Sequence, residues 1–268
     1  MKYIIKKLLT LILTLFFISV LVFLIFQVIP GDPALSILGT EATEEQVEAL
    51  REQLGLNDPM PERYFNWFTG VLTGNLGRSY RYQESLNEQM EVSRLIAGKL
   101  PVTLTLAGLS LLLIIIFSIP IGILWGGTKS RFIDGALNVL SQFTMSVPSF
   151  FLGIIIIYLF GLIMRWFTPG GYISYKEDFR GYIRYMLFPA ITVALPKIAM
   201  TAKFLRNSII TQLKSDYVRT AYSKGARRMR VLFVHVLRNA MIPVVTFIGV
   251  IAAEIAAGSI VVEQVFGL

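Results

Sequence analysis

Residues 216–243 read DYVRTAYSKGARRMRVLFVHVLRNAMIP, a polar and basic stretch that lies between two strongly apolar segments. Its second half places apolar residues at helical spacing and arginines mostly on other faces, which is the pattern of a basic amphipathic helix. The apolar residues are Met229, Leu232, Phe233, Val236 and Ala240, and the arginines are Arg227, Arg228, Arg230 and Arg238. A second helical stripe precedes Gly225, formed by Ile210, Leu213, Tyr217, Val218 and Ala221. Because glycine adopts a positive φ without steric cost, the stretch predicts a helix, a turn at Gly225 and a second helix.

Composition alone leaves open a basic loop held against anionic lipid, which is a common role of such helices. The order of the residues favours a different role. DYVRTA, Lys224-Gly225 and the sequence from His235 to Pro243 resemble the cytoplasmic "EAA" loop of ABC-transporter permeases, in the form found in dipeptide and oligopeptide importers. The resemblance implies a coupling helix that docks into a groove on an ATPase subunit. The matching positions are Asp216, Tyr217, Arg219, Thr220, Ala221, Lys224, Gly225, His235, Arg238, Asn239 and Pro243.

Two departures from the general motif accompany this resemblance. Arg219-Thr220-Ala221 stands where the motif has Glu-Ala-Ala, and the proline follows the glycine at a greater distance. Both departures suit the peptide branch of the family better than the sugar or amino-acid permeases.

The composition predicts a membrane protein. Of 268 residues 54% are hydrophobic and the mean hydropathy is +0.64, whereas an ordinary soluble domain is about 45–50% apolar even with glycine included. The chain has no cysteine and one histidine, His235. Disulfide scaffolds, thiolate metal sites and multi-histidine ligand sets are therefore excluded, and no metal site is predicted.

Charge is distributed unevenly between the apolar segments. Residues 30–99 contain 6 Lys or Arg and 11 Asp or Glu, whereas residues 203–238 contain 9 and 1. This one-sidedness is the positive-inside pattern of membrane proteins and not a nucleic-acid-binding stripe. It predicts that residues 30–99 are extracytoplasmic and that the basic stretch is cytoplasmic.

Five apolar segments are long enough to span a bilayer. The first, Leu8–Ile29, follows three lysines and exceeds the apolar core of a signal peptide, which predicts a retained helix with a cytoplasmic N-terminus. The second is expected to start at Pro101, in the first helical turn. The last four run over about Pro101–Trp125, Ala136–Met164, Leu187–Leu205 and Met241–Val262. A cytoplasmic turn at 126–134 and an outer loop at 165–185 are expected between them.

The region after the first span begins Pro30-Gly31-Asp32-Pro33 and contains a predicted helix from Thr43 to Leu54, with Thr43 and Glu44 placed to cap it. With its later Gly-rich motifs it is similar to the extended region that follows the first span in peptide permeases. Glu91 departs from the proline expected before the second span.

Ionisable and kinking residues inside the spans are candidates for a translocation path. Lys197 and Glu254 lie within spans, where a charge costs at least about 2.5–3.5 kcal/mol and so requires a partner or water. A mutual ion pair and exposure to a hydrated path both remain open. Ser146 and Pro148 are expected to kink the third span, either for packing or beside the path. Ser146-x-Pro148-x-Phe150 is similar to a motif of the family.

The sequence lacks the motifs expected of an ATPase, a secondary transporter or an intramembrane enzyme. The sequence GGTKS at 126–130 lacks the glycine before lysine of a P-loop and follows no strand, so this chain is not expected to bind ATP. A secondary transporter would show internal repeats, and none is evident. An intramembrane enzyme would need a motif such as H-E-x-x-H or G-x-S-x-G, and no catalytic residue is predicted.

The resemblance extends from Pro30 to Phe266 and implies an all-α polytopic membrane protein with the type I ABC importer permease fold. It divides the chain into residues 1–29, an extracytoplasmic region 30–99 and a permease core 100–268 with the coupling loop 206–240. The family has a sixth span that these residues do not supply, so a truncated chain is expected. The resemblance implies a bacterial or archaeal inner membrane, a homologous second permease, two ATPase subunits that hold ATP and Mg²⁺, and an extracytoplasmic solute-binding protein. Nickel complexes and glutathione-like solutes remain alternatives to peptides as cargo.

Overall fold

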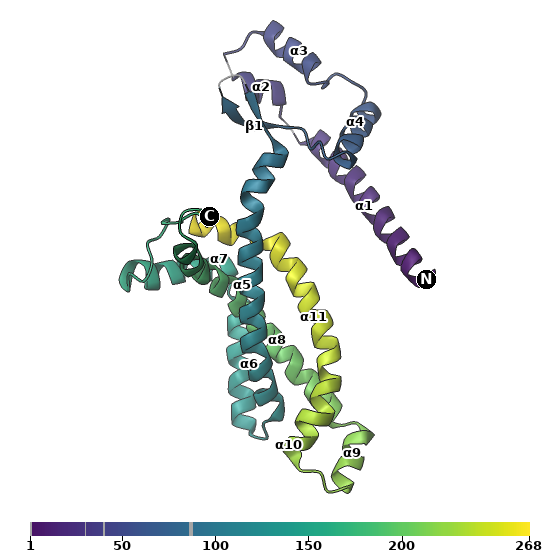
Figure 1. Cartoon of the computed structure of the whole chain (residues 1–268), viewed down its shortest axis with the longest axis vertical. Helices are drawn as coiled ribbons and strands as arrows, with labels where there is room; N and C mark the ends of the chain where they lie inside the picture. The colour runs from purple at the N-terminus through teal and green to yellow at the C-terminus, as the bar shows by residue number, and fades with distance from the viewer. Residues whose placement is uncertain (1, 30, 40, 86–87) are drawn as a thin grey trace. The chain divides into compact units, whose positions relative to one another are not determined.

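The computed structural model describes residues 2–29, 31–39, 41–85 and 88–268. The chain divides into two compact units, Met1–Lys99 and Leu100–Leu268. Helices make up most of the regular structure, and the described residues contain one two-stranded sheet (Figure 1).

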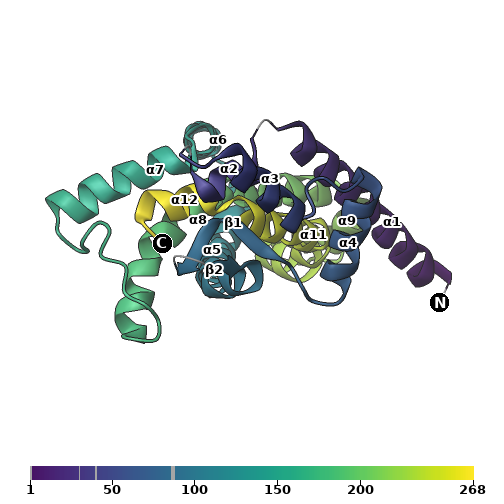
Figure 2. The same ribbon diagram turned by 90° about the horizontal axis from the view of Figure 1, so that it is seen from above.

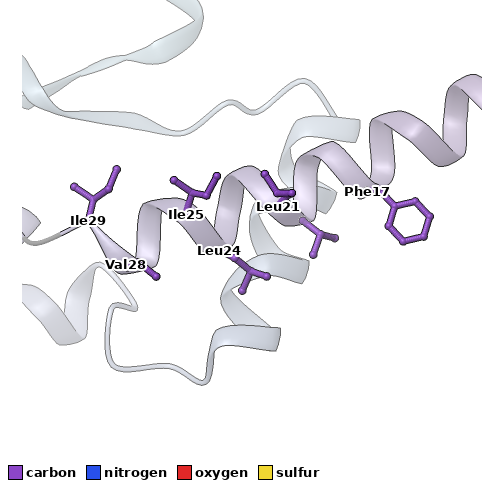
Figure 3. A pocket seen from close by; sticks show the side chains of 7 residues that line it. Phe17, Leu21, Leu24, Ile25, Val28 and Ile29 are labelled. Carbon is purple, nitrogen blue, oxygen red and sulfur yellow. The ribbon is translucent and has the colours of Figure 1, made fainter.

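The first unit contains a long apolar helix, three short helices and the sheet. These elements are α1 (Lys2–Val28), α2 (Pro33–Leu38), α3 (Glu44–Gln53), α4 (Met60–Leu72), β1 (Arg78–Ser85) and β2 (Glu88–Glu91). The strands are antiparallel with an irregular register that pairs Arg78 with Glu91. One face of α1 forms an open apolar surface, which Figure 3 shows as side chains from Phe17 to Ile29 directed away from the helix. A helix with this surface is suited to a bilayer.

Capping residues define the short helices of the first unit. Thr43 Oγ1 accepts the N–H of Gln46, and Gln46 Oε1 accepts the N–H of Thr43 at 3.0 Å, which completes a capping box. The helix predicted from Thr43 to Leu54 is confirmed, with Thr43 as its cap and Glu44 as its first residue. Asp32 caps α2 by accepting the N–H of Ala34 at 2.9 Å, with Pro33 in the first turn. Pro30, the first residue of that predicted motif, lies outside the described residues.

The second unit is built from long helices and the short segments between them. They are α5 (Val92–Gly127, which begins at the end of the first unit), α6 (Arg131–Ser146), α7 (Ser149–Ile156), the π-helix η1 (Ile157–Ile163), α8 (Phe179–Leu213), α9 (Asp216–Ser223), α10 (Arg228–Arg230), the π-helix η2 (Val231–Val236), α11 (Leu237–Gly258) and α12 (Ile260–Phe266). Figure 1 shows α9 and α10 at one end of this unit and α12 at the other.

Four described helices are long and apolar enough to cross a membrane, or five if a bent pair counts as one span. The bent pair corrects the prediction of one kinked helix over Ala136–Met164. α6 ends at Ser146, α7 begins at Ser149, and the pair is bent by 93°. In Figure 2 α6 is seen end-on while α7 lies across the view. The cause is Pro148, because the residue before a proline avoids the helical region, and Val147 is extended with ψ 123°.

The boundaries of three other predicted spans also differ. α5 begins at Val92, so Pro101 lies inside the helix and not in its first turn. α8 begins at Phe179, inside the predicted outer loop, because Asp178 caps it by accepting the N–H of Arg180. The last span ends at Gly258, and α12 follows as a separate helix. A span predicted from hydropathy covers only the apolar part of a helix, so its ends need not coincide with the ends of the helix.

Small residues bring α5 close to α8. A Cβ atom added to Gly122 would lie 2.9 Å from Leu205 Cβ, and one added to Gly126 would lie 2.9 Å from Ile209 Cβ. Close backbone approach at small residues is typical of helix packing in membranes. At the other end of α8, the hydroxyl of Tyr185 donates to the carbonyl of Phe266 at 2.6 Å and attaches α12.

Candidate coupling surface

The predicted glycine turn is confirmed between α9 and α10. α9 ends at Ser223, and Gly225 has φ +76°. Its N–H donates to Tyr222 at 2.9 Å, and the N–H of Ala226 donates to Ala221 at 3.1 Å, so the backbone reverses within a few residues. The single helical stripe predicted from Ile210 to Ala221 is wrong, because the helix is interrupted at residues 214–215 and α9 starts anew at Asp216.

The apolar side of this segment packs on the ends of α8 and α11. Val218 and Val231 are buried together with Leu205 and Ile209 of α8. The rest of this cluster is Leu232, Val236, Ala240 and Val244. The hydroxyl of Tyr217 donates to Gln212 Oε1 at 2.8 Å and adds a polar link to α8. α9 is therefore fixed to both long helices by a small core.

The opposite side is exposed, basic and partly apolar. The side chains of Asp216 and Arg219 are 96% and 83% exposed and form an i,i+3 pair at 3.5 Å. Met229 and Phe233, which were predicted to share one apolar stripe with the buried Leu232, Val236 and Ala240, are exposed. The physical reason is η2, whose extra residue per turn shifts the register so that Val231 is buried. The sequence pattern did not identify this π-helical turn.

We define the coupling surface as the exposed residues of α9, the Gly225 turn, α10 and η2. Eight of the predicted coupling residues are exposed: Asp216, Arg219, Thr220, Lys224, Gly225, His235, Arg238 and Pro243. Of these, Arg238 and Pro243 lie beyond this surface, in α11. Tyr217, Ala221 and Asn239 are half-buried. Asn239 and Pro243 belong to α11, so the structure separates them from the surface formed by α9. Arginine, methionine and aromatic side chains together are typical of protein interfaces.

Contacts connect the coupling surface to the turn between α5 and α6. The guanidinium of Arg228 donates to the carbonyl oxygen of Gly127. A Cβ atom on Gly127 would lie 3.1 Å from Leu232 of η2, so the two segments touch. α10 and η2 therefore contact the end of α5, and η2 also packs on α8 and α11.

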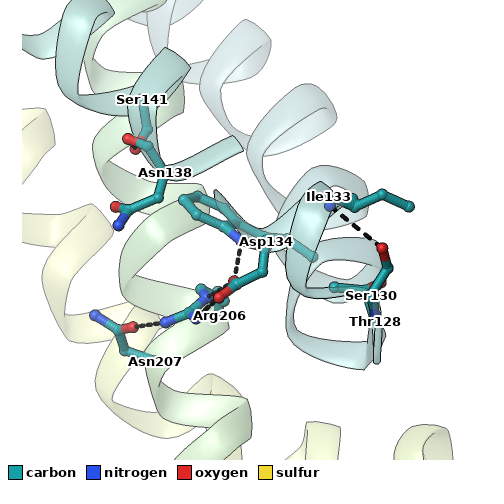
Figure 4. Close-up of polar contacts among 9 residues, drawn as sticks. Thr128, Ser130, Ile133, Asp134, Asn138, Ser141, Arg206 and Asn207 are labelled. Carbon is teal, nitrogen blue, oxygen red and sulfur yellow. Dashed lines mark hydrogen bonds and ion pairs between the residues drawn. The ribbon is translucent and has the colours of Figure 1, made fainter. Parts of the chain in front are cut away.

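A polar cluster beside this turn joins α6 to α8, and sequence reasoning missed it. Arg206 Nη2 donates to both oxygens of Asp134 at 2.6 and 2.7 Å (Figure 4). Trp125 Nε1 donates to the same carboxylate at 2.7 Å, and the guanidinium of Arg206 lies 5.4 Å from the centre of the Trp125 ring. The opposite charges of Asp134 and Arg206, near the ends of two predicted spans, were the feature of the sequence that could have indicated this ion pair.

The candidate path residues lie in two separate places. Ser146 ends α6 and Pro148 precedes α7, and both are exposed. Glu254 of α11 forms an ion pair with Lys197 of α8, and their side chains remain 49% and 27% exposed. The mutual pair, one of the two alternatives for these charges, is thus present. The described residues contain no group of three or more His, Cys, Asp or Glu able to hold a metal ion.

Comparison with known proteins identifies this architecture. Residues 118–268 match the family model described as "Binding-protein-dependent transport system inner membrane component", and residues 1–107 match the model of the N-terminal part of such components. The chain belongs to this family of inner membrane transport components. The coupling surface and the long apolar helices are therefore parts of a membrane-embedded transport permease.

Two relatives of this permease illustrate the match. The "Probable peptide ABC transporter permease protein y4tP" of Sinorhizobium fredii is 35% identical over 266 residues, which cover 99% of this chain and 83% of the relative. The "Oligopeptide transport system permease protein AppB" of Bacillus subtilis is 34% identical over 266 residues, which cover 98% and 83%. Both matches include the two units described above.

Proposed function

We propose that this chain is the permease subunit of an ATP-driven ABC importer of dipeptides or oligopeptides. The observation that carries the proposal is the coupling surface, an exposed helix–turn–helix segment, basic at its turn and in α10, whose apolar side packs on the ends of the spans. The names of the two relatives support the substrate class, since both are peptide permeases by name.

Coupling follows from how α9 is attached. An ATPase subunit that docks on α9 and η2 would move them as one body, because their apolar sides share a core with α8 and α11. Switching by rigid-body movement of packed helices is a common device of transport and regulation. Arg228 would extend the same movement to the turn at Gly127.

The complete importer would contain a homologous second permease and two ABC ATPases, with ATP and Mg²⁺ on the ATPases. A solute-binding protein would deliver peptide from the extracytoplasmic side. The excess of Lys and Arg in residues 203–238 supports a cytoplasmic coupling surface, and with it a cytoplasmic N-terminus in a bacterial or archaeal inner membrane.

The ion pair between Lys197 and Glu254 supports a position for the path. Lipid is a poor environment for a partly exposed charged pair within spans, so this face of α8 and α11 would border water, peptide or the second permease. Pro148 and Ser146 would contribute at the break between α6 and α7.

Uptake by the reconstituted importer tests the proposal. The chain, its second permease and its ATPases are placed in proteoliposomes with the binding protein and labelled peptide. Uptake should require ATP and persist without an ion gradient. Uptake driven by an ion gradient without ATP would favour a secondary transporter. If the importer preferred a nickel complex or glutathione to peptides, that solute would be the substrate instead.

A further inference from the structure

A cavity in the first unit, lined by apolar and polar residues, lies beside the last turns of α1 and takes no part in the coupling surface. Its volume is about 690 Å³, within the range of small-molecule sites. Val22, Phe23 and Phe26 of α1 form one wall. The other walls carry polar and aromatic residues, among them Asp58, Arg63, Asn66, Trp67 and Tyr80. A smaller cavity of about 390 Å³ shares Phe26, Arg63 and Tyr80 with it.

Arg63 lines both cavities and is half-buried without a partner. Within the residues that the structure describes, its side chain forms no hydrogen bond or ion pair. Arg51, which lines the smaller cavity, differs because it is paired with Asp32 and Glu48. A guanidinium in a cavity with no carboxylate partner is a site for an anionic ligand, and its planar fork fits phosphate.

Two carboxylates line the same cavities as Arg63, Asp58 the larger one and Asp32 the smaller one. Asp32 is engaged, because it accepts hydrogen bonds from Arg51 and from the N–H of Ala34. Asp58 lines the larger cavity, and in the described part of the chain its side chain has no partner. The larger cavity therefore presents one cation and one anion that are both available to a ligand.

The residues around α4 are of the kinds found where a membrane helix meets the lipid headgroups. Tyr64 and Phe68 of α4 pack edge-to-face on Phe16 of the apolar α1, and the hydroxyls of Tyr64 and Ser19 are hydrogen-bonded at 2.9 Å. Trp67 and Tyr80 are exposed at the cavity, as aromatic residues are at the level of lipid headgroups. The outer side of α4 also exposes apolar side chains, Met60, Phe65 and Leu72.

We propose that this cavity binds the headgroup of a zwitterionic phospholipid. The phosphate contacts Arg63, the ammonium of an ethanolamine headgroup donates to Asp58, and an acyl chain follows Val22, Phe23 and Phe26. A soluble anion would use Arg63 alone and would gain nothing from the apolar wall of a membrane span. The bound lipid would hold α4 against α1.

Lipid retention by the purified full chain tests this proposal. The protein is incubated in detergent with equal amounts of phosphatidylethanolamine, phosphatidylcholine and phosphatidylglycerol, and retained lipid is identified by native mass spectrometry. Phosphatidylethanolamine should be enriched. Arg63→Gln should reduce its retention about tenfold, the usual effect of losing one charge-assisted hydrogen bond. Asp58→Asn should remove the preference over phosphatidylglycerol, and the matched control Arg180→Gln, an exposed arginine in the other unit, should change nothing.

Equal retention of the three lipids, or unchanged retention by folded Arg63→Gln, would overturn the proposal. Displacement of the lipid by inorganic phosphate or by the dipeptide Ala-Ala would overturn it too, and would assign the cavity to a soluble ligand. If Arg63→Gln does not yield folded protein, Arg63→Lys carries the test. Lysine keeps the charge and loses the bidentate fork, so a several-fold reduction is again expected.

Discussion

Arg206 holds both carboxylate oxygens of Asp134, 72 residues earlier in the chain, and thereby fixes α6 to α8 beside the coupling surface. Arg206→Gln should lower the free energy of unfolding by roughly 1–2 kcal/mol, a range that allows for solvent screening of the partly exposed carboxylate. Thermal unfolding in detergent measures this change. Arg131→Gln, an exposed arginine on the same α6, is the control and should be near neutral. Equal effects of the two substitutions would show that the Asp134–Arg206 pair contributes nothing to stability.

Gly225→Pro should uncouple ATP hydrolysis from transport. The φ of +76° is closed to proline, whose ring fixes φ near −65°, and the substitution also removes the N–H that donates to Tyr222. Peptide uptake by the reconstituted importer should be lost, whereas ATP hydrolysis by the isolated ATPase subunits is unchanged. Gly225→Asn is the matched control, since asparagine tolerates the left-handed region, and it should retain most uptake. Normal uptake by the proline variant would refute the coupling role.

Ala221→Glu should have a similar effect for a different reason. Ala221 is half-buried against the cluster that joins α9 to α8 and α11, so a larger charged side chain would displace α9. Uptake should fall while the spans remain folded. Thr220→Glu adds the same charge at an exposed neighbour, and it should affect docking without displacing α9; cross-linking of α9 to α8 distinguishes the two.

Glu254→Gln should reduce peptide uptake and leave the amount of assembled importer unchanged if this face borders the path. The substitution leaves Lys197 without its partner. The double variant Lys197→Gln with Glu254→Gln removes both charges and should restore any stability lost in the single variant, but not uptake. Loss of assembled protein in Glu254→Gln, recovered together with uptake in the double variant, would assign the pair a purely structural role.

Gly122→Val should destabilise the second unit by roughly 1–3 kcal/mol, as overpacking does in close-packed cores. The added atoms would meet Leu205 and the carbonyl of Ala202 at 2.9–3.0 Å. Gly108→Val is the control on the same helix, because a Cβ atom there meets nothing within 4 Å. Thermal melts of the two variants should differ clearly, and equal melting temperatures would contradict the close contact of α5 and α8.

Acidification should loosen the contact between Asp32 and α3. The hydrogen bond from Arg51 holds the pKa of Asp32 below its ordinary value of 3.8. A carboxylate with a lowered pKa stabilises the folded form above its ordinary pKa, and this stabilisation is lost as the pH falls through the lowered value. Relative to the intrinsic exchange rate at each pH, the protection of α2 and α3 against hydrogen exchange should therefore fall below about pH 4. Arg51→Gln should already show fast exchange at neutral pH, and an unaltered pH profile in this variant would exclude the pair as the cause.

Local rules predicted some local features of this fold correctly and missed others. The capped helix start at Thr43 and the reversal at Gly225 follow from the residue types at those positions. The π-helical turn at Val231–Val236 was not predicted. Nearly every residue of this segment is apolar, so its sequence fits a regular α-helix equally well. The cluster of Asp134, Arg206 and Trp125 required knowledge of which span ends are neighbours. The position of the Lys197–Glu254 pair depends on the same tertiary information, although each charge was notable in the sequence.

The extended backbone at Val147 has a consequence for the surroundings of the break between α6 and α7. Inside a bilayer, each peptide group must find its hydrogen-bonding partner within protein or in water, and a non-helical residue leaves groups unsatisfied. Hydrocarbon tails therefore cannot surround this elbow in the native membrane. Neighbouring polypeptide or a wet cavity must shelter it, so the elbow marks a point where the isolated chain is structurally incomplete.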